Sequence, residues 1–85
     1  MGTNFPVAEY LRPHILDART ISRTGAWWTA ILVIEDPRNN KPYIALYKWQ
    51  SKDGSWRKST SFRISQGKHL TGIVETLAEF SEHLS

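Results

Sequence analysis

The chain contains no cysteine among its 85 residues, so it can form neither an internal disulfide nor a thiolate metal site. Its histidines, His14, His69 and His83, are too scattered to resemble a zinc-binding set. The longest apolar run, residues 30–34, is far shorter than the ~20 residues that a transmembrane helix requires, and the N-terminus lacks a basic-then-apolar signal. We therefore expect an intracellular protein (cytoplasmic, nucleoid-associated or nuclear) that holds no metal and contacts no membrane.

The side-chain groupings that usually carry catalysis are also absent from the sequence. It holds no glycine-rich phosphate loop and no recognisable set of nucleophile, base and acid. Glu75, Glu79 and Glu82 are spaced as on one side of a helix, which is typical of a solvated surface rather than of paired catalytic carboxylates. We expect a protein that is not an enzyme and that uses no cofactor and no small-molecule substrate.

Positive charge is distributed unevenly along the chain. The net charge is +3, but residues 1–64 hold ten Lys or Arg against five Asp or Glu, whereas residues 65–85 hold one Lys against three Glu. The first segment therefore carries +5 and the second −2. A basic region beside an acidic one favours an anionic partner on the basic side.

Turn residues divide the chain into short segments with the pattern of strands followed by one helix. Four strands are predicted, at residues 15–23, 26–35, 43–50 and 55–64. Residues 4–12 are expected to form a short helix with Asn4 as its N-cap, which Pro13 would end. The length allows one domain, residues 1–85. The predicted fold is α+β: a four-stranded antiparallel meander, preceded by the short helix and followed by a C-terminal amphipathic helix.

The C-terminal segment has the clearest periodicity in the chain. Apolar side chains recur at three- and four-residue spacing over residues 70–84, and Ser65 is the expected N-cap. This apolar stripe is larger than one thin sheet needs, so we expect it to join two chains into a homodimer. The residues expected at the dimer interface are Leu70, Ile73, Val74, Leu77, Phe80 and Leu84.

The third predicted strand separates two kinds of side chain by alternation. Tyr43, Tyr47 and Trp49 share one face, whereas Ile44 and Leu46 share the other. The aliphatic pair is the expected core side, so the three rings are predicted to be exposed. Exposed rings beside cations suit unpaired bases, which stack on the rings while phosphates bind Lys and Arg. The alternative, that these rings fill a small core, stays open.

The first and last strands supply further rings and cations. Regular alternation places Arg57 and Arg63 on one face of the last strand and Trp56 on the other. It also places Arg19 and Arg23 on the same face of the first strand. Alternatively, the cations protect the strand edges from aggregation. The alternative role of Trp56 is packing against a side chain of the neighbouring strand across the hairpin.

One of the neighbouring residues Trp27 and Trp28 must face outward if the second strand is regular, because neighbours point to opposite faces. The sequence leaves open which of the two it is, and Trp28 is included among the candidates. The candidate nucleic-acid-binding residues are Tyr43, Tyr47, Lys48, Trp49, Trp56, Arg57, Lys58, Arg63, Arg19, Arg23 and Trp28.

Residues 44–80 carry several motifs in a fixed order. They are Ile-Ala-Leu-Tyr-Lys-Trp at residues 44–49, the turn Lys52-Asp53-Gly54, the basic Trp56-Arg57-Lys58, the strand ending Phe62-Arg63-Ile64 and the helix over residues 70–77. This series resembles the positive-cofactor-four family of transcriptional coactivators, with Lys48 where an arginine is usual and without the family's Pro-Gly and Lys-Gly dipeptides. The resemblance implies a dimer formed through C-terminal helices, whose curved sheets form channels for single-stranded DNA.

The expected function is therefore binding of single-stranded nucleic acid, DNA before RNA, with little sequence preference. Base stacking and the release of counterions from phosphates would supply the affinity. Two alternatives stay open. One is a protein-interaction module whose aromatic face or helix docks another protein. The other is an architectural protein that inserts apolar side chains into the minor groove of duplex DNA.

Overall fold

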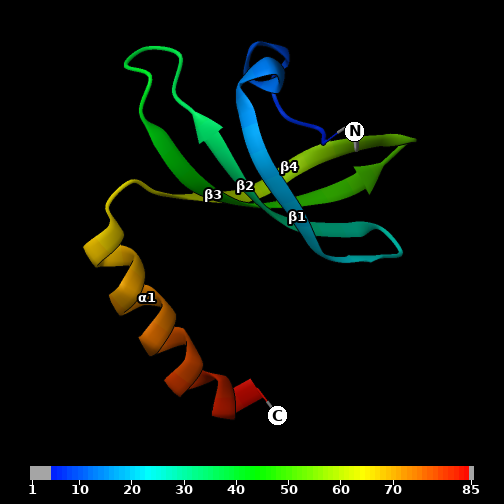
Figure 1. The fold of residues 1–85 in the computed structure, drawn as a ribbon. Helices are drawn as coiled ribbons and strands as arrows, with labels where there is room; N and C mark the ends of the chain where they lie inside the picture. The colour runs from blue at the N-terminus through cyan, green and yellow to red at the C-terminus, as the bar shows by residue number, and fades with distance from the viewer. Residues whose placement is uncertain (1–4, 85) are drawn as a thin grey trace.

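A computed structural model describes residues 5–84, in which one antiparallel sheet separates a short N-terminal helix from a longer C-terminal helix (Figure 1). The elements in chain order are the 3₁₀ helix η1 (Glu9–His14), β1 (Ile15–Thr24), β2 (Trp27–Glu35), β3 (Pro42–Lys52), β4 (Ser55–Ile64), α1 (Gly67–Phe80) and the 3₁₀ helix η2 (Ser81–Leu84). The strands pair in the order β1-β2-β3-β4. The predicted α+β fold is confirmed.

The helix ends differ from the expectation. Asn4 lies outside the described residues, and η1 begins at Glu9 and includes Pro13 instead of ending before it. A 3₁₀ helix tolerates this proline because its backbone φ is close to the fixed φ of the proline ring. The N-cap of α1 is Gln66 rather than Ser65, and no side-chain hydrogen bond caps the helix. Within residues 5–84, no helix is both long enough and apolar enough to cross a membrane.

The sheet has two distinct faces, which we name the core face and the outer face. The core face carries Trp28, Leu32 and Trp49, and the outer face carries Ile31 and Lys48, because cross-strand partners point to the same side. The N-terminal segment covers the core face with Phe5, Val7 and Leu11. The core is therefore built from one face of the sheet and an irregular segment with a short helix, and not from the sheet and α1.

The aromatic rings of the core face form one connected cluster. Trp28 lies 5.4 Å from Phe5, 5.1 Å from Trp49 and 5.4 Å from Trp56, measured between ring centroids. The indole Nε1 of Trp28 donates a hydrogen bond of 3.0 Å to the hydroxyl of Thr20. These contacts link three buried rings, Phe5, Trp28 and Trp49, with the half-buried Trp56.

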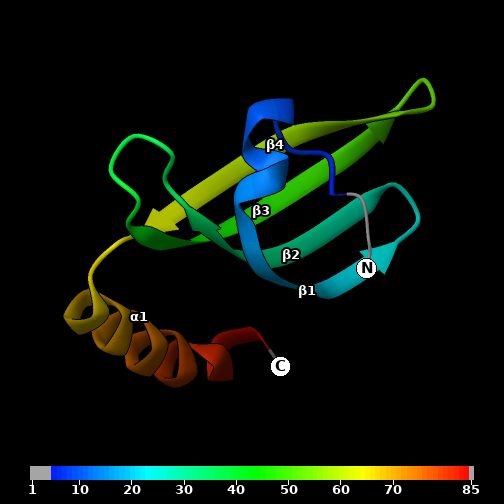
Figure 2. The ribbon, with the colours of Figure 1, turned by 45° about the horizontal axis from the view of Figure 1, so that its top comes forward.

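Helix α1 lies on the other side of the sheet and covers little of it (Figure 2). Leu70, in its first turn, lines an apolar pocket with Ile44 and Ile64, and Ile73 is half-buried. The remaining apolar side chains of the stripe, Val74, Leu77, Phe80 and Leu84, are all more than half exposed. The helix therefore presents an apolar stripe with no partner among the described residues.

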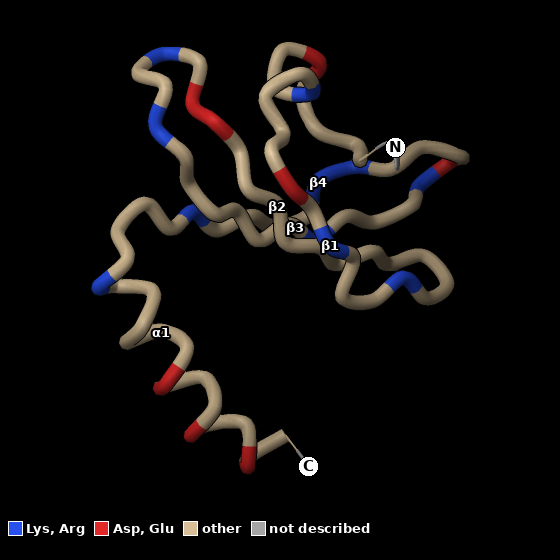
Figure 3. Tube along the Cα trace, in the orientation of Figure 1, with Lys and Arg blue, Asp and Glu red and all other residues tan. Residues whose placement is uncertain are grey.

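Charge follows the division between sheet and helix (Figure 3). Lys and Arg are spread over the strands and their connecting loops, whereas α1 carries Lys68 in its first turn and acidic residues further along. The basic region that the sequence analysis expected is thus placed on the sheet, away from the acidic part of the helix.

Candidate nucleic-acid interface

A groove lies between the N-terminal segment and the part of the sheet formed by β3 and β4. Its volume is about 550 Å³, within the range of roughly 300–1,000 Å³ that is typical of ligand sites. Tyr10 and Leu11 contribute from η1, and Arg38 contributes from the loop after β2. The strands contribute Tyr43 and Tyr47 from β3, and Lys58 and Arg63 from β4. Four of the residues predicted from the sequence are therefore brought together here.

Tyr47 is the ring of the groove that is best placed to stack on a base. It is half-buried, and its ring lies parallel to that of Trp49 at a centroid distance of 5.2 Å and an angle of 4°. Trp49 covers one face of Tyr47, and Tyr47 also lines the groove, so a base that enters the groove can reach this ring. Burial raises the pKa of Tyr47, so its hydroxyl stays protonated at neutral pH and can donate a hydrogen bond.

The neighbouring ring, Tyr43, supports a cation. The guanidinium carbon of Arg63 lies 3.8 Å from the centroid of the Tyr43 ring, a distance typical of a cation–π contact. Tyr43 is buried and belongs to the same core cluster as Phe5, Val7 and Leu11 of the N-terminal segment. It therefore acts as a platform that fixes the position of Arg63 rather than as a stacking surface for a base.

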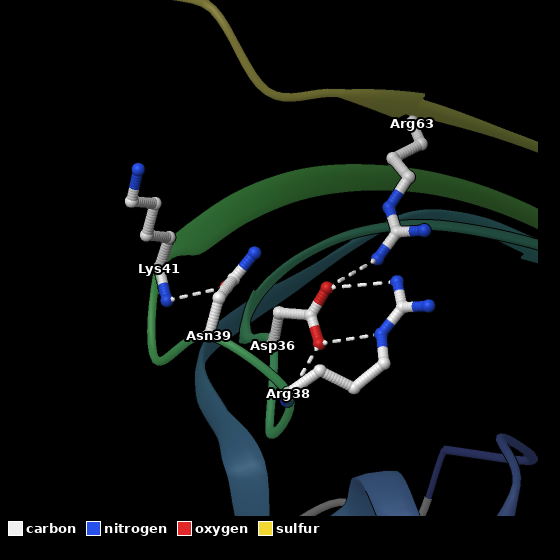
Figure 4. A network of polar contacts seen from close by, with 5 residues as sticks. All are labelled: Asp36, Arg38, Asn39, Lys41 and Arg63. Atoms are coloured by element: carbon white, nitrogen blue, oxygen red, sulfur yellow. Dashed lines mark hydrogen bonds and ion pairs between the residues drawn. The ribbon is translucent and has the colours of Figure 1, made fainter.

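The loop after β2 holds a buried carboxylate between two arginines (Figure 4). Arg38 donates to Asp36 through its backbone N, its Nε and its Nη2, at 2.9, 3.2 and 3.1 Å. Arg63 donates through Nη2 at 3.3 Å, which joins β4 to this loop across 27 residues of sequence. The backbone of the loop is closed by a hydrogen bond from Asp36 N to the carbonyl of Lys41, at 2.9 Å.

The hydrogen bonds from Arg38 hold the pKa of Asp36 below its ordinary value, with the positive charges of Arg38 and Arg63 acting in the same direction. A carboxylate with a lowered pKa in the folded state stabilises the fold above its unfolded pKa, near about 4, and loses this effect as the pH falls through the folded pKa. We expect Asp36→Asn to be less stable than the native chain at neutral pH, and the two free energies of unfolding to converge in strong acid. Urea unfolding across this pH range measures the difference. A difference that is constant with pH would contradict this role of Asp36.

The structure corrects the prediction that the rings of β3 form an open face. Trp49 and Trp28 are 0% and 2% exposed, and Tyr43 is 9% exposed. Trp56 is half-buried against the edge of Trp28. The aliphatic pair that was expected in the core, Ile44 and Leu46, lies on the outer face instead, and Trp27 rather than Trp28 is the exposed tryptophan of β2. The prediction was wrong because the cover of the sheet is the aromatic-rich N-terminal segment and not the helix.

The structure also corrects the expected placement of the cations on β1. The pairing of β1 with β2 shifts register after Thr20, so Arg19 lies opposite Ile31 on the outer face while Arg23 lies opposite Trp28 on the core face. The guanidinium carbon of Arg23 is 4.1 Å from the centroid of the Trp28 ring. A β-bulge of this kind reverses the side on which later residues point. Arg19 and Arg23 therefore do not share a face.

A register shift between β3 and β4 likewise separates the cations of β4. Lys58 pairs with Trp49 on the core face and lines the groove, whereas Arg57 pairs with Gln50 on the outer face. Arg63 pairs with Ala45 and also reaches the groove. Arg57 and Arg63, which were expected on one face, are thus on opposite faces.

A cation–π contact also forms on the outer face. The Nζ atom of Lys48 lies 4.7 Å from the centroid of the exposed Trp27 ring. Arg19 and Arg57 also belong to this face. The predicted cations are therefore divided between the groove and the outer face.

Tyr10, Asp36 and Arg38 are among the residues of the groove that the sequence did not single out. Asp36 and its neighbours were interpreted as turn residues, and Tyr10 as part of a helix. The one available signal was an acidic residue two positions before an arginine in a turn, a spacing at which the Asp side chain commonly binds the backbone N–H two residues later. That spacing indicates a local turn and contains no information about Arg63.

Comparisons of the chain with models of protein families, with curated proteins and with solved structures find no match. The roles proposed for the groove and for the apolar stripe of α1 therefore rest on the residues that form them.

Proposed function

We propose that this protein binds single-stranded nucleic acid, DNA before RNA, in the groove and with little sequence preference. The observation that supports this most strongly is the convergence of a half-buried stacking ring, Tyr47, with the cations Lys58, Arg63 and Arg38 in one groove. A base of an unpaired strand has a free face to lay on Tyr47, and the adjoining phosphates are within reach of the cations. This role belongs inside the cell and requires no catalysis or cofactor.

The same chemistry explains why a single strand is favoured over a duplex. In a duplex the faces of the bases are covered by their stacked neighbours, so a side chain meets base edges and phosphates instead. Tyr47 lines the groove as a ring for stacking, and only an unstacked base can stack on it. Stacking tolerates every base, and phosphate contacts carry no sequence information.

A matched pair of variants tests the groove as the binding site, because Lys58 and Arg57 are neighbours in sequence on opposite faces of β4. We expect Lys58→Ala to weaken the binding of a short labelled oligo(dT) and to reduce the slope of log Kd against log salt by about 0.7, the value for one phosphate contact on a single strand. Arg57→Ala should leave both unchanged. Fluorescence anisotropy over a series of salt concentrations measures the two quantities.

A competition experiment tests whether a single strand is preferred over a duplex. An unlabelled single strand should displace the probe at concentrations at which a duplex of the same sequence does not. If Arg57→Ala weakens binding and Lys58→Ala does not, the strand binds the outer face beside Trp27 and Lys48. If the native chain binds no oligonucleotide at low salt, the proposed function is wrong.

We also propose that the chain forms a homodimer through the exposed apolar stripe of α1. The helix has 14 residues, and only Leu70 and Ile73, near its beginning, are partly buried. An isolated helix of this length is marginal in water, and a contiguous apolar stripe of this kind marks a contact surface. A second copy of the chain supplies an identical stripe, which is the self-complementary surface that a two-fold dimer needs.

A further inference from the structure

The geometry points to a site for one phosphate group at the loop end of the groove, formed by Arg38 and Arg63 and held in shape by Asp36. This inference rests on the proposed function and deepens it, because it assigns one nucleotide phosphate to two named guanidinium groups. Neither Arg38 nor Asp36 is predicted from the sequence as part of a binding site. The shared chemistry of the ligand is a phosphate ester, either inside a strand or at its 5′ end.

One carboxylate aligns the two guanidinium groups. Asp36 accepts Nε and Nη2 of Arg38 and Nη2 of Arg63. The Nη1 group of each arginine makes no hydrogen bond within residues 5–84. Figure 4 shows these two Nη1 groups on the same side, both pointing away from Asp36. Two N–H₂ groups that point in one direction match the separate oxygens of a phosphate.

The charge at this point is suited to an anion. The side chains of Arg38 and Arg63 are 78% and 49% exposed, whereas that of Asp36 is 9% exposed. A ligand in the groove therefore meets two cations, while the single negative charge lies behind them. The three groups together carry a charge of +1, so an incoming phosphate is attracted rather than repelled.

The arrangement is also pre-organised. Arg63 is fixed by Asp36 on one side and by the ring of Tyr43 beneath it. The guanidinium of Arg38 is held by two hydrogen bonds to the same carboxylate, and a third, from the backbone N, fixes the loop beneath it. Long side chains normally lose rotamer freedom when they bind a ligand, and this loss is reduced where the free protein already holds them in place. Asp36 therefore positions the two guanidinium groups for the phosphate.

The neighbouring rings make a nucleotide phosphate the ligand that fits best. Tyr47 and Tyr10 line the same groove as the two arginines, and a nucleotide is the phosphate ester that also carries a flat base for such rings. A carboxylate of a peptide would use the arginines and leave the rings without a partner. The competing explanation is that the network merely ties the loop after β2 to β4, in which case its loss changes stability and not binding.

The experiment compares the native chain with Arg38→Ala, with Arg38→Lys and with Arg12→Ala as the matched control. Arg12 is an exposed arginine of η1 that does not line the groove. We expect Arg38→Ala to raise the Kd for oligo(dT) about tenfold and to reduce the salt slope by about 0.7. Arg38→Lys should keep the salt slope and recover only part of the affinity, because an ammonium group lacks the planar fork of the guanidinium. Arg12→Ala should match the native chain.

A second arm of the experiment compares oligo(dT) with and without a 5′-phosphate. If the 5′-phosphate tightens binding and Arg38→Ala abolishes the gain, the site takes a terminal phosphate. If the two probes bind equally and Arg38→Ala weakens both, it takes a phosphate inside the strand. Thermal unfolding of each variant checks that the fold is intact.

The outcomes separate the two proposals. If the native chain binds oligo(dT) and Lys58→Ala weakens it, while Arg38→Ala and Arg38→Lys bind as the native chain does, the phosphate site is wrong and the groove stands. If Arg38→Ala changes the melting temperature alone, the network is structural and the phosphate site is again wrong. If no oligonucleotide binds the native chain, both proposals fail together.

Discussion

Replacement of Trp49 by alanine is expected to remove most of the free energy of unfolding of the protein. Trp49 is 0% exposed, and its ring centroid lies 6.1, 5.1 and 5.2 Å from those of Phe5, Trp28 and Tyr47. Truncating a buried tryptophan costs about 3–5 kcal/mol, and domains of this size have total stabilities at the lower end of about 5–15 kcal/mol. Urea unfolding followed by circular dichroism measures the loss in the free energy of unfolding.

The matched control is Trp27→Ala, which removes the same side chain from the opposite face of the neighbouring strand. Trp27 is 41% exposed, so its replacement should change the free energy of unfolding by less than about 1 kcal/mol. Trp49→Phe should be milder than Trp49→Ala, because it keeps a ring and removes an indole N–H that has no hydrogen-bond partner within residues 5–84. A stable Trp49→Ala variant together with an unfolded Trp27→Ala variant would reverse the assignment of the core face.

The native chain is expected to behave as a dimer at micromolar concentration, with a mass about twice its 9.8 kDa in light scattering. Leu77→Lys should convert it to a monomer, because Leu77 is central in the apolar stripe and a buried lysine without a partner is strongly unfavourable. We also expect the helical signal in circular dichroism to fall. A helix of 14 residues with little contact to the sheet is marginal without its partner.

Glu75→Lys is the control for this variant, since it introduces the same residue on the opposite side of α1. It should leave the mass unchanged. A native chain that is monomeric at this concentration would contradict the dimer, and a dimer that survives Leu77→Lys would place the contact elsewhere. Neither result affects the groove, because α1 and the N-terminal segment lie on opposite sides of the sheet (Figure 1).

A dimer through α1 would make two grooves available to one nucleic-acid strand. A two-fold dimer through α1 leaves the core face of each sheet, with its groove, facing away from the helices. Two grooves in one particle allow a long strand to occupy both, which raises the apparent affinity without any new contact. Monomeric Leu77→Lys is therefore expected to bind a short oligonucleotide as the native chain does and a long one more weakly.

Local patterns in the sequence were sufficient to determine the elements and their order. Turn residues and alternating strands predicted the meander, since antiparallel strands joined by short turns pair with their neighbours. The spacing of residues 70–84 predicted α1, and the charge count predicted a basic sheet and an acidic helix. Lys58, Arg63 and Tyr47, which line the groove, were also among the candidates predicted from the sequence, because their residue types alone suit an anionic, aromatic ligand.

The tertiary structure decided which face of the sheet is the core and which residues meet in the groove. Alternation defines two faces of a strand but does not say which one another segment covers, so Tyr43 and Trp49 were placed on the wrong side. A single register shift after Thr20 reversed Arg23 relative to Arg19, and no pattern in the sequence marks it. The meeting of Asp36 with Arg63 depends on the pairing of β3 between β2 and β4, which brings together residues 27 positions apart. Contacts of this kind arise from packing between segments that are distant in sequence, so local sequence patterns do not predict them.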